Sequence, residues 1–290
     1  MTVWLAVDAR DRLGECGLWC ERSGALWWTD IEGCTISRLQ PDGRVRTWTL
    51  PQRVGSFAFC AGSDTQLLLG LDSGIAVFDF ETESLSPVIP VEAGLPATRI
   101  NDGRCDRQGR FVFGMYNPKE EAVSGFYRVH PDLRVERLPL APAAVGNGIG
   151  FSPDGTTMYY TDSPTRTIWS VDYRVDGSLG EPRVFVQLRR EEGYADGSCV
   201  DAEGGIWNAQ WEGRCVVRYD PRGRETARIA LPVSRPTCPV FGGPGLDVLY
   251  VTSARGGLSQ DRLGDEPQAG GVFAVQPGWR GLPESRFVLR

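Results

Sequence analysis

The stretch "PDGTTMYYTDSPTRTIWSVDY", residues 153–173, decides the fold of this chain. It opens on the turn signal Pro-Asp-Gly, which is followed by a short β-rich strand, a second turn and another short strand. Directly upstream, the segment "GNGIGF" places Asn147 between two glycines. The architecture depends on whether this unit of turns and strands recurs along the chain.

Five other segments have the same order of turn, strand, turn and strand. They are "SGALWWTDIEGCTISRLQPDG", "SDTQLLLGLDSGIAVFDFET", "RQGRFVFGMYN…SGFYRVHPD", "AEGGIWNAQWEGRCVVRYDPRG" and "GLDVLYVTSARGG…AGGVFAV". The aligned strand residues of the six units are Trp28, Leu69, Phe113, Tyr160, Trp207 and Tyr250, at separations of 41, 44, 47, 47 and 43 residues. A period in the forties with several strands per repeat is typical of propeller blades of four strands each.

The repeat predicts an all-β protein, a six-bladed β-propeller that occupies residues 1–290 as a single domain. Long amphipathic helical patterns are lacking, and the 36 glycines and 20 prolines are spread between the strands as punctuation. The strand from Trp4 to Val7 is expected to complete a blade begun at the C-terminus, which closes the ring without an exposed edge. The alternative is a β-sandwich or barrel whose regularity is accidental.

Composition argues against several classes of function. The net charge of −6 makes a nucleic-acid partner unfavourable. No apolar run approaches 18 residues, so no membrane span is expected, and the N-terminus lacks the pattern of a signal peptide. We therefore expect a cytoplasmic monomer whose eight scattered cysteines are reduced thiols, mostly small core residues.

The chain contains a single histidine, His130, in the turn-like segment "VHPDL". A Ser-His-Asp triad would require this residue, and a position in a surface turn is the better interpretation. Zinc sites built from several histidines are excluded by the count.

Polar residues recur at one position of the repeat. The innermost strand of a propeller blade precedes the aligned strand and lines the central channel, so equivalent positions converge on one axis. Between 11 and 13 residues before the aligned strands lie four polar side chains, each with a small neighbour: Glu15, Asn101, Asn147 and Asp196. The two remaining repeats carry Gly55-Ser56 and Thr237-Cys238 at about this offset.

Convergence would bring two carboxylates and two amides to one mouth of the channel. Carboxylates crowded into a dry cavity repel each other unless a cation or a proton intervenes. Oxygen-only ligands suit a hard divalent cation such as Ca²⁺, Mg²⁺ or Mn²⁺. Because Asn-Gly and Asp-Gly are also common turn dipeptides, each position taken alone is better explained as a turn, and a metal site is indicated only by the four positions in phase with the repeat.

At these positions the chain resembles the family of senescence marker protein, also called regucalcin, and the bacterial gluconolactonases. The resemblance extends over the whole chain. It is carried by "LGECGLW" (family L-G-E-G-P-x-W), "RINDG" (R-x-N-D-G), "GNGIGFSPDGTTMYYTDS" ([ST]-N-G-x-x-x-S-x-D-x-x-x-x-Y-x-x-D-S), "ADGSCVDAEGGIW" (P-D-G-x-x-x-D-x-x-G-x-x-W), "FGG" and "TSARGGLS…PQAGGVFAV".

The resemblance implies a six-bladed β-propeller that hydrolyses sugar lactones, aldonolactones such as glucono-, xylono-, arabinono- or galactonolactone. It implies that Glu15, Asn147 and Asp196 bind one divalent metal ion, with Ca²⁺ expected first and zinc, manganese, magnesium or iron as alternatives. It further implies that Arg99 and Asn101 contact the substrate and that Asp196 is the catalytic base.

The chain departs from the family pattern next to the ligands. Cys16-Gly17 stands where the family has Gly-Pro, Gly146 where it has Ser or Thr, and Ala195 where it has Pro. These departures affect the shape of the loops more than the metal ligands. A further family acid has no clean equivalent, and its nearest candidates, Glu120 and Glu121 in "NPKEEA", are expected to be solvated loop residues.

Two alternatives to a sugar lactonase stay open. One is a paraoxonase-like hydrolase of aryl esters, although such proteins usually place histidine near the ion and His130 is not expected to reach it. The other is a divalent-cation-binding propeller without catalysis, because fold alone does not define function. Arg99 beside Asn101 favours an enzyme, since an ion buffer needs ligands but no guanidinium at the same mouth.

Overall fold

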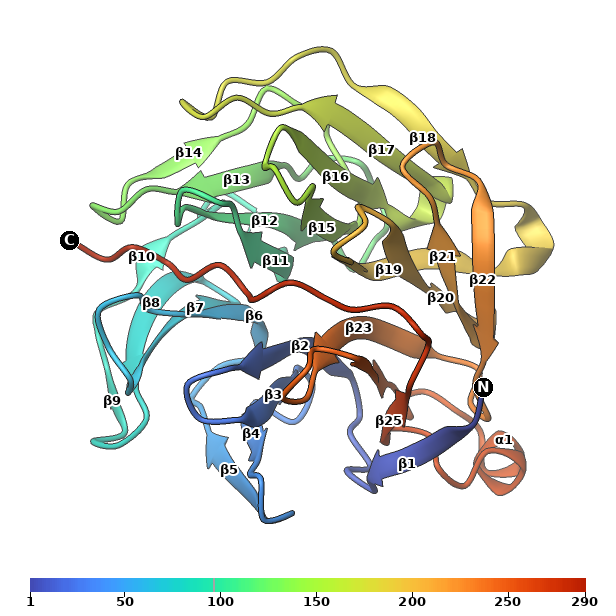
Figure 1. Ribbon diagram of the computed structural model, residues 1–290. Coiled ribbons are helices and arrows are strands. Elements are labelled where there is room, and N and C mark those ends of the chain that lie inside the picture. Colours follow the sequence, from blue (N-terminus) through green and yellow to red (C-terminus); the bar gives the residue numbers. More distant parts are fainter. Residues whose placement is uncertain (96) are drawn as a thin grey trace.

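Six antiparallel sheets follow one another along the chain and close into a ring around a central channel (Figure 1). The computed structural model describes residues 1–95 and 97–290. The prediction of an all-β, six-bladed β-propeller is confirmed. Helical structure in the described residues is confined to α1 (Gln260–Asp265) and two short 3-10 turns, η1 (Ser163–Thr165) and η2 (Arg190–Glu192).

The N-terminal half of the chain forms the first three blades. Blade 1 consists of β2 (Gly14–Cys20), β3 (Ala25–Asp30), β4 (Thr35–Leu39) and β5 (Val45–Thr49). Blade 2 consists of β6 (Val54–Phe59), β7 (Gln66–Leu71) and β8 (Gly74–Asp79), with the short strands β9 (Ser84–Leu85) and β10 (Ile89–Pro90) both paired to β8. Blade 3 consists of β11 (Arg99–Cys105), β12 (Phe111–Tyr116), β13 (Phe126–Val129) and β14 (Val135–Arg137).

The second three blades complete the ring. Blade 4 consists of β15 (Gly146–Phe151), β16 (Thr157–Asp162), β17 (Thr167–Asp172) and β18 (Arg183–Gln187). Blade 5 consists of β19 (Tyr194–Val200), β20 (Ile206–Trp211), β21 (Cys215–Tyr219) and β22 (Glu225–Ala230). Blade 6 consists of β23 (Pro236–Gly242), β24 (Val248–Ser253), β25 (Val272–Val275) and the N-terminal strand β1 (Val3–Val7).

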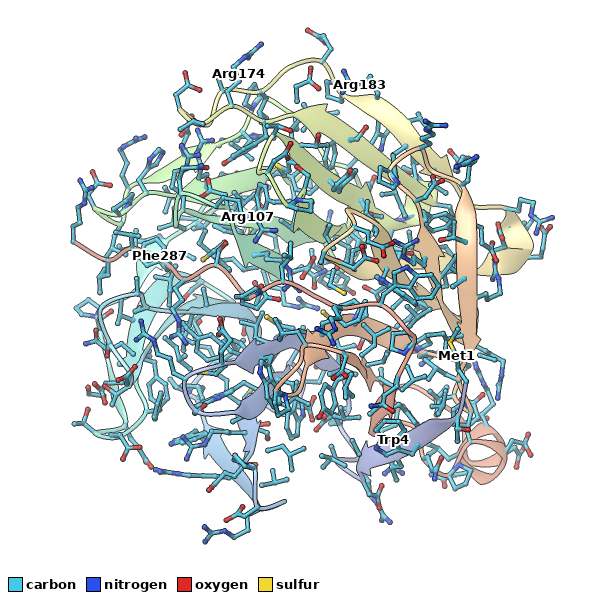
Figure 2. The ribbon with its side chains drawn as sticks, in the orientation of Figure 1. Met1, Trp4, Arg107, Arg174, Arg183 and Phe287 are labelled. Carbon is cyan, nitrogen blue, oxygen red and sulfur yellow. The ribbon has the colours of Figure 1, made fainter. Side chains whose placement is uncertain are left out.

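The ring closes by pairing the two ends of the chain. Strand β1 runs antiparallel to β25, with Trp4 opposite Ala274, and Figure 2 shows Trp4 on this outer strand. The expected closure of the last blade by the N-terminal strand is therefore confirmed. Because each terminal segment supplies part of one sheet, neither can leave without exposing an unpaired strand edge.

Aromatic side chains fill the spaces between neighbouring blades. Trp27 of blade 1 stacks on Trp48 with ring centroids 5.2 Å apart, and its ring centroid lies 5.0 Å from that of Phe80, which follows β8 of blade 2. Trp207 of blade 5 meets Phe241 of blade 6 edge to face at 5.9 Å. Such pairs stabilise by about 0.5–1.5 kcal/mol beyond the burial of their area. The blades are thus fixed against one another, which holds the channel in one shape.

The innermost strand of each blade carries a β-bulge at a similar position. In each blade the register between the first and second strands shifts, at Glu15/Leu18, Val54/Ser56, Ile100/Gly103, Asn147/Gly150, Ala195/Ser198 and Pro236/Pro239. Figure 1 shows these strands, β2, β6, β11, β15, β19 and β23, nearest the centre. A bulge breaks the strict alternation of a strand and re-aims its side chains. The repeat therefore delivers the same local distortion six times around the channel.

The C-terminal segment crosses one face of the propeller (red in Figure 1). Phe287, labelled in Figure 2, is fully buried and its backbone bonds to Phe59 and Ala61 of blade 2 at 2.8 and 2.7 Å. Glu284 of the same segment pairs with Arg104, near the end of β11. This segment covers the end of the channel at which β11 finishes.

The remaining general expectations concern thiols and membranes. The eight cysteines, all within the described residues, are free thiols, and seven of them are buried. Among residues 1–95 and 97–290, none of the helices has the length and apolar character needed to cross a membrane.

Candidate functional site

The five residues predicted for the site line one pocket at the end of the channel where β11 begins. The pocket has a volume of about 330 Å³, and Glu15, Arg99, Asn101, Asn147 and Asp196 all border it. They come from four blades, since β2, β11, β15 and β19 each contribute from the innermost position. The structure thus brings together residues that lie up to 181 positions apart in the sequence. A pocket of this size suits a small molecule.

Two carboxylates lie buried in this pocket. Glu15 and Asp196 are each 6% exposed. Burial raises the pKa of Glu15 well above its usual value, and the charges of Asp196 and Asp102 raise it further. Burial likewise raises the pKa of Asp196, with Asp102 adding to the shift. Arg99 opposes both shifts without cancelling them, so the protein leaves this pair of carboxyl groups short of positive charge.

Arg99 and the two amides form a continuous chain of hydrogen bonds beside the carboxylates. Nη1 of Arg99 donates to Oδ1 of Asn101 at 2.6 Å, and Nδ2 of Asn101 donates to Oδ1 of Asn147 at 2.9 Å. The guanidinium also lies 4.3 Å from the ring centroid of Tyr116, a favourable cation–π distance. Burial, together with the charge of Arg53, lowers the pKa of Arg99 to about 10, so it stays cationic at neutral pH.

The bulges explain why these side chains reach the pocket from strands buried on both faces. The residue after Glu15, Cys16, has φ 46°, and the residue after Asn147, Gly148, has φ 62°. Both values lie in the left-handed region that glycine adopts without strain. A Cβ at Gly148 would also meet Oγ1 of Thr161 at 2.6 Å. The turn of the backbone directly after Glu15 and directly after Asn147 is therefore a local requirement of the site.

The structure shows what the residues at the three departures from the family pattern contact. A Cβ at Gly146 would lie 2.7 Å from Cα of Gly114 in blade 3, so this chain admits no side chain there without a backbone shift. Ala195 is fully buried and its carbonyl oxygen accepts a hydrogen bond from Oγ of Ser163 at 2.7 Å. Cys16 occupies a strained conformation, and its Sγ accepts from the backbone N–H of Phe57 at 3.3 Å.

The donor set fits a hard divalent cation. Within the described part of the chain no group of three His, Cys, Asp or Glu side chains is placed to hold a metal ion. A cation here would therefore rely on the amide oxygen of Asn147 in addition to the carboxylates of Glu15 and Asp196. Carboxylate and amide oxygens are the ligands that Ca²⁺, Mg²⁺ and Mn²⁺ prefer, and a cation would offset the burial and the neighbouring negative charge that raise both pKa values.

Sequence reasoning missed one buried acid below the pocket. Asp102 is 4% exposed, its Oδ2 accepts from the N–H of Ile149 at 2.8 Å, and burial raises its pKa. Simple alternation along a strand would turn Asp102 away from the face that Asn101 occupies. The bulge between Ile100 and Gly103 breaks that alternation. The "RINDG" motif therefore contained the residue, but the two-residue period of a strand predicted the wrong orientation for it.

Further pocket residues lie at the ends of strands and in loops. Glu32, Tyr116, Glu120, Tyr194 and Trp211 all border the pocket. Glu120 is exposed, as expected for a loop residue, yet it also faces the pocket, whereas Glu121 lies in the same exposed loop without lining it. Loop positions of this kind follow from the folded geometry, and no spacing in the sequence indicates them.

His130 does not take part in the site. Its Nε2 lies 2.7 Å from Oε2 of Glu136 on the outer strand β14, and it does not border the pocket. The turn around it is closed by a bond from the N–H of Leu133 to the carbonyl of His130 at 2.8 Å. The expectation of a turn histidine away from the channel is therefore confirmed, and a Ser-His-Asp triad is excluded.

The fold and the pocket together define a class of protein: a six-bladed propeller with an oxygen-rich, acidic site at one mouth of its channel. Residues 13–255 match the family described as SMP-30/Gluconolactonase/LRE-like region. The chain belongs to this family, as its motifs indicated.

Individual relatives extend the match over nearly the whole chain. The L-arabinolactonase of Azospirillum brasilense is 49% identical, with 98% of this chain and 95% of that protein covered. The 6-deoxy-6-sulfogluconolactonase of Pseudomonas putida is 34% identical, with 95% of each chain covered. The crystal structure of regucalcin from Agrobacterium tumefaciens, described as a calcium-binding protein, superimposes with a TM-score of 0.93 at 33% identity and covers 98% of this chain and 96% of that one.

Proposed function

We propose that this protein is a sugar lactonase that hydrolyses an aldonolactone to the open-chain sugar acid, with a divalent cation held by Glu15, Asn147 and Asp196. The observation that carries the proposal is the pair of buried carboxyl groups, Glu15 and Asp196, whose pKa values are raised by burial and by neighbouring carboxylates, beside a buried Arg99 in the same pocket. The 49% identity to an L-arabinolactonase supports a pentonolactone as the first substrate to test.

A cation bound by these oxygens would polarise the lactone carbonyl as a Lewis acid and stabilise charge on its oxygen during attack. Arg99 and Asn101 bind hydroxyl groups of the sugar, the guanidinium as donor and the amide oxygen as acceptor. Both N–H groups of Asn101 are already donated, to the carbonyl of Gly146 at 3.1 Å and to Oδ1 of Asn147 at 2.9 Å. The hydrogen bond between Arg99 and Asn101 fixes both groups before the substrate arrives. Pre-formed donors of this kind cost little reorganisation when the substrate binds.

Asp196 moves the proton. Its carboxylate accepts a proton from the attacking water as the water oxygen bonds to the carbonyl carbon. The bond between that carbon and the ring oxygen then breaks, and the departing alkoxide takes the proton from Asp196 to become a hydroxyl group. One water is consumed and one hydroxy acid is formed, so Asp196 returns to its starting state and no covalent enzyme intermediate is required.

The charge of the pocket favours neutral lactones over anionic ones. Four carboxyl-bearing residues line it against the single guanidinium of Arg99: Glu15, Glu32, Glu120 and Asp196. Glu32 is paired with Arg53 at 3.1 Å, so with all four carboxylates ionised and one divalent cation bound these charges cancel. The exposed Glu120 is then the carboxylate that meets an incoming substrate at the rim. A phosphate or sulfonate on the sugar would add repulsion, whereas hydroxyl groups would find both donors and acceptors.

The alternatives are less well supported by the pocket. A cation buffer without catalysis does not account for Arg99, Tyr116 and Asn101 aligned beside the ligands. A paraoxonase-like hydrolase with histidine near the ion is disfavoured, because His130 is engaged with Glu136 away from the pocket.

The test is a panel of lactones measured by acid release and corrected for spontaneous hydrolysis. The panel contains neutral L-arabinono-, D-xylono-, D-glucono- and D-galactonolactone and one phosphorylated gluconolactone. We expect turnover of neutral lactones that chelation abolishes and a divalent salt restores. Undiminished turnover in verified metal-free protein would overturn the cation's role, and absence of turnover on every lactone would overturn the reaction.

The same panel tests the charge argument. Glu120→Gln removes one pocket charge, and a change of about 1 kcal/mol at close range would raise kcat/KM for the phosphorylated lactone about fivefold relative to a neutral one. Glu121→Gln removes a charge of the same loop outside the pocket and serves as the matched control. Equal effects of the two variants would show that the pocket does not select by charge.

A further inference from the structure

The two ends of the stretch from Gly146 to Ser163 meet beside the proposed cation ligands. Strands β15 and β16 pair so that Asn147 lies opposite Thr161 and Gly146 opposite Asp162. Nδ2 of Asn147 donates to Oγ of Ser163 at 2.9 Å. Oγ of Ser163 in turn donates to the carbonyl oxygen of Ala195 at 2.7 Å, one residue before Asp196. Ser163 therefore joins the amide of blade 4 to the backbone of blade 5.

These two bonds extend the series of hydrogen bonds that begins at Arg99, and every bond in the series donates in the same direction, from Arg99 toward Ala195. A guanidinium can only donate, so Asn101 must present its oxygen to Arg99 and its NH₂ group to Asn147. A backbone carbonyl can only accept, so the hydroxyl of Ser163 must donate its hydrogen to the carbonyl of Ala195 and accept a hydrogen bond from Asn147. The two ends of this hydrogen-bond series, Arg99 and the carbonyl of Ala195, thus impose the same orientation on the amide of Asn147.

The orientation matters because an amide ligates a cation only through its oxygen. A reversed Asn147 would place its NH₂ group against the NH₂ group of Asn101 and where the oxygen now lies. In the observed orientation Oδ1 accepts one bond from Asn101 and keeps a second lone pair. Ser163 is the group that takes up the NH₂ end and so makes the observed orientation the favourable one.

The backbone around Ser163 is itself held firmly. Oδ1 of Asp162 accepts from the N–H groups of Ala144 and Val145 at 3.1 and 2.9 Å, just ahead of Asn147. The N–H of Ser163 donates to the carbonyl of Val145 at 3.0 Å. The pair Asp162-Ser163 therefore clamps the entry of β15 by its backbone and the ligand by its side chain.

We propose that Ser163 is a positioning residue that orients the Asn147 amide for cation binding. The proposal rests on the proposed function, because it assigns Asn147 to the ion. Partners that orient a ligand typically change metal affinity 10- to 100-fold when removed. The effect is expected on the cation first and on the substrate only through it.

The experiment measures divalent-cation affinity by isothermal titration calorimetry with Ca²⁺ and with Mn²⁺, alongside kcat and KM at saturating ion. Ser163→Ala is expected to weaken the ion about tenfold or more, with kcat largely recovered at saturating ion. Ser163→Thr keeps the hydroxyl and is expected to bind within about threefold of the parent. Ser37→Ala removes a hydroxyl bonded at 2.9 Å to Thr47 on the outer strands of blade 1, remote from the site, and serves as the matched control.

Three outcomes would overturn the proposal. Ser163→Ala with the parent's ion affinity would show that the NH₂ end of Asn147 needs no partner, so that Asn101 alone suffices to orient the amide. A higher KM at unchanged ion affinity would make Ser163 a substrate contact instead. Equal weakening by Ser163→Ala and Ser163→Thr would show that packing, not the hydroxyl, is responsible. A parent protein that binds neither ion would instead refute the cation of the proposed function, which separates the two failures.

Discussion

The two ends of the central channel treat buried charge in opposite ways. At the site end, Glu15 and Asp196 are buried side by side and their pKa values are raised. At the other end, Arg104 pairs with Glu284 of the C-terminal segment, with side chains 8% and 15% exposed. Burial alone would lower the pKa of Arg104, but Glu284 and other nearby negative groups outweigh it and the net shift is upward. At the covered end the buried charges neutralise each other within the protein. At the site end the carboxyl groups lack such a partner, and a bound cation would supply the missing positive charge.

This difference in charge pairing assigns different roles to the two ends of the channel, binding and chemistry at one end and stability at the other. Strand β11 contributes Arg99 and Asn101 to one end and Arg104 to the other, only three residues beyond Asn101. A buried charge without a partner costs several kcal/mol, which a protein tolerates where binding or chemistry uses it. The covered end is thus expected to govern stability, and the open end to govern turnover and cation affinity.

The largest effect is expected from removing the proposed base. Asp196→Asn keeps an oxygen ligand of similar size but cannot accept a proton as a carboxylate does. We expect turnover to fall by about 10²–10⁴ and to stay low when the cation is saturating. Glu15→Gln removes a ligand charge without removing the base, so its activity should recover in part at high cation concentration. The measurement is turnover against cation concentration for both variants, with folding checked by circular dichroism.

Full rescue of Asp196→Asn by saturating cation would contradict this division of roles and place the base elsewhere. Lasting inactivity of Glu15→Gln would show that the two carboxylates act as one unit and that no assignment of separate roles is justified.

The next largest effect is expected at the covered end. Glu284→Gln leaves the buried Arg104 without its carboxylate, and breaking such a pair is expected to cost about 3 kcal/mol of unfolding free energy. Denaturant unfolding measures the loss, and kcat at a temperature below the transition should match the parent. The matched control is Glu81→Gln, whose partner Arg46 lies 3.7 Å away with both side chains more than a third exposed, so that less than about 1 kcal/mol is expected.

Equal unfolding free energies for Glu284→Gln and Glu81→Gln would contradict the view that the covered end stabilises the ring. A fall in kcat without loss of stability would mean that the two ends are coupled through the channel.

The fold could be read from the sequence because a propeller repeats its signal. Each of the six aligned residues, from Trp28 to Tyr250, lies on the second strand of its blade, and the counted-back positions lie on the first. A single match to a turn or strand pattern is weak, but six in phase constrain one architecture. The same phase brought Glu15, Asn101, Asn147 and Asp196 to one pocket.

The parts of the site that escaped sequence reasoning depend on backbone detail and on long loops. Asp102 reaches the channel only because of a bulge, which moves a residue off the two-residue period of its strand. Glu120 borders the pocket from a loop whose path is set by the blades on either side. The bond between Asn147 and Ser163 joins residues 16 positions apart and follows from strand register, which spacing alone does not determine.

The smallest expected effect concerns backbone strain at the open end. Cys16 follows Glu15, a proposed cation ligand, is 1% exposed and has φ 46°, a conformation that costs a residue with a side chain about 1–2 kcal/mol. Cys199 lies on the innermost strand β19 at the covered end, near Arg104 and Glu284, and its φ is not positive. The two buried thiols are therefore matched in type and burial and differ in backbone conformation.

Replacing each cysteine by Ala and by Gly isolates the strain, because both replacements remove the same thiol. At Cys199 the ordinary order should hold, with Gly less stable than Ala by about 0.5–1 kcal/mol. At Cys16 the order should reverse, because Gly adopts the left-handed conformation freely and Ala does not, and Gly should be the more stable by up to about 1 kcal/mol. Denaturant unfolding of the four variants gives both differences directly. The same order at both positions would show that the open end carries no local strain beside its ligand, and the contrast between the two ends would then rest on charge alone.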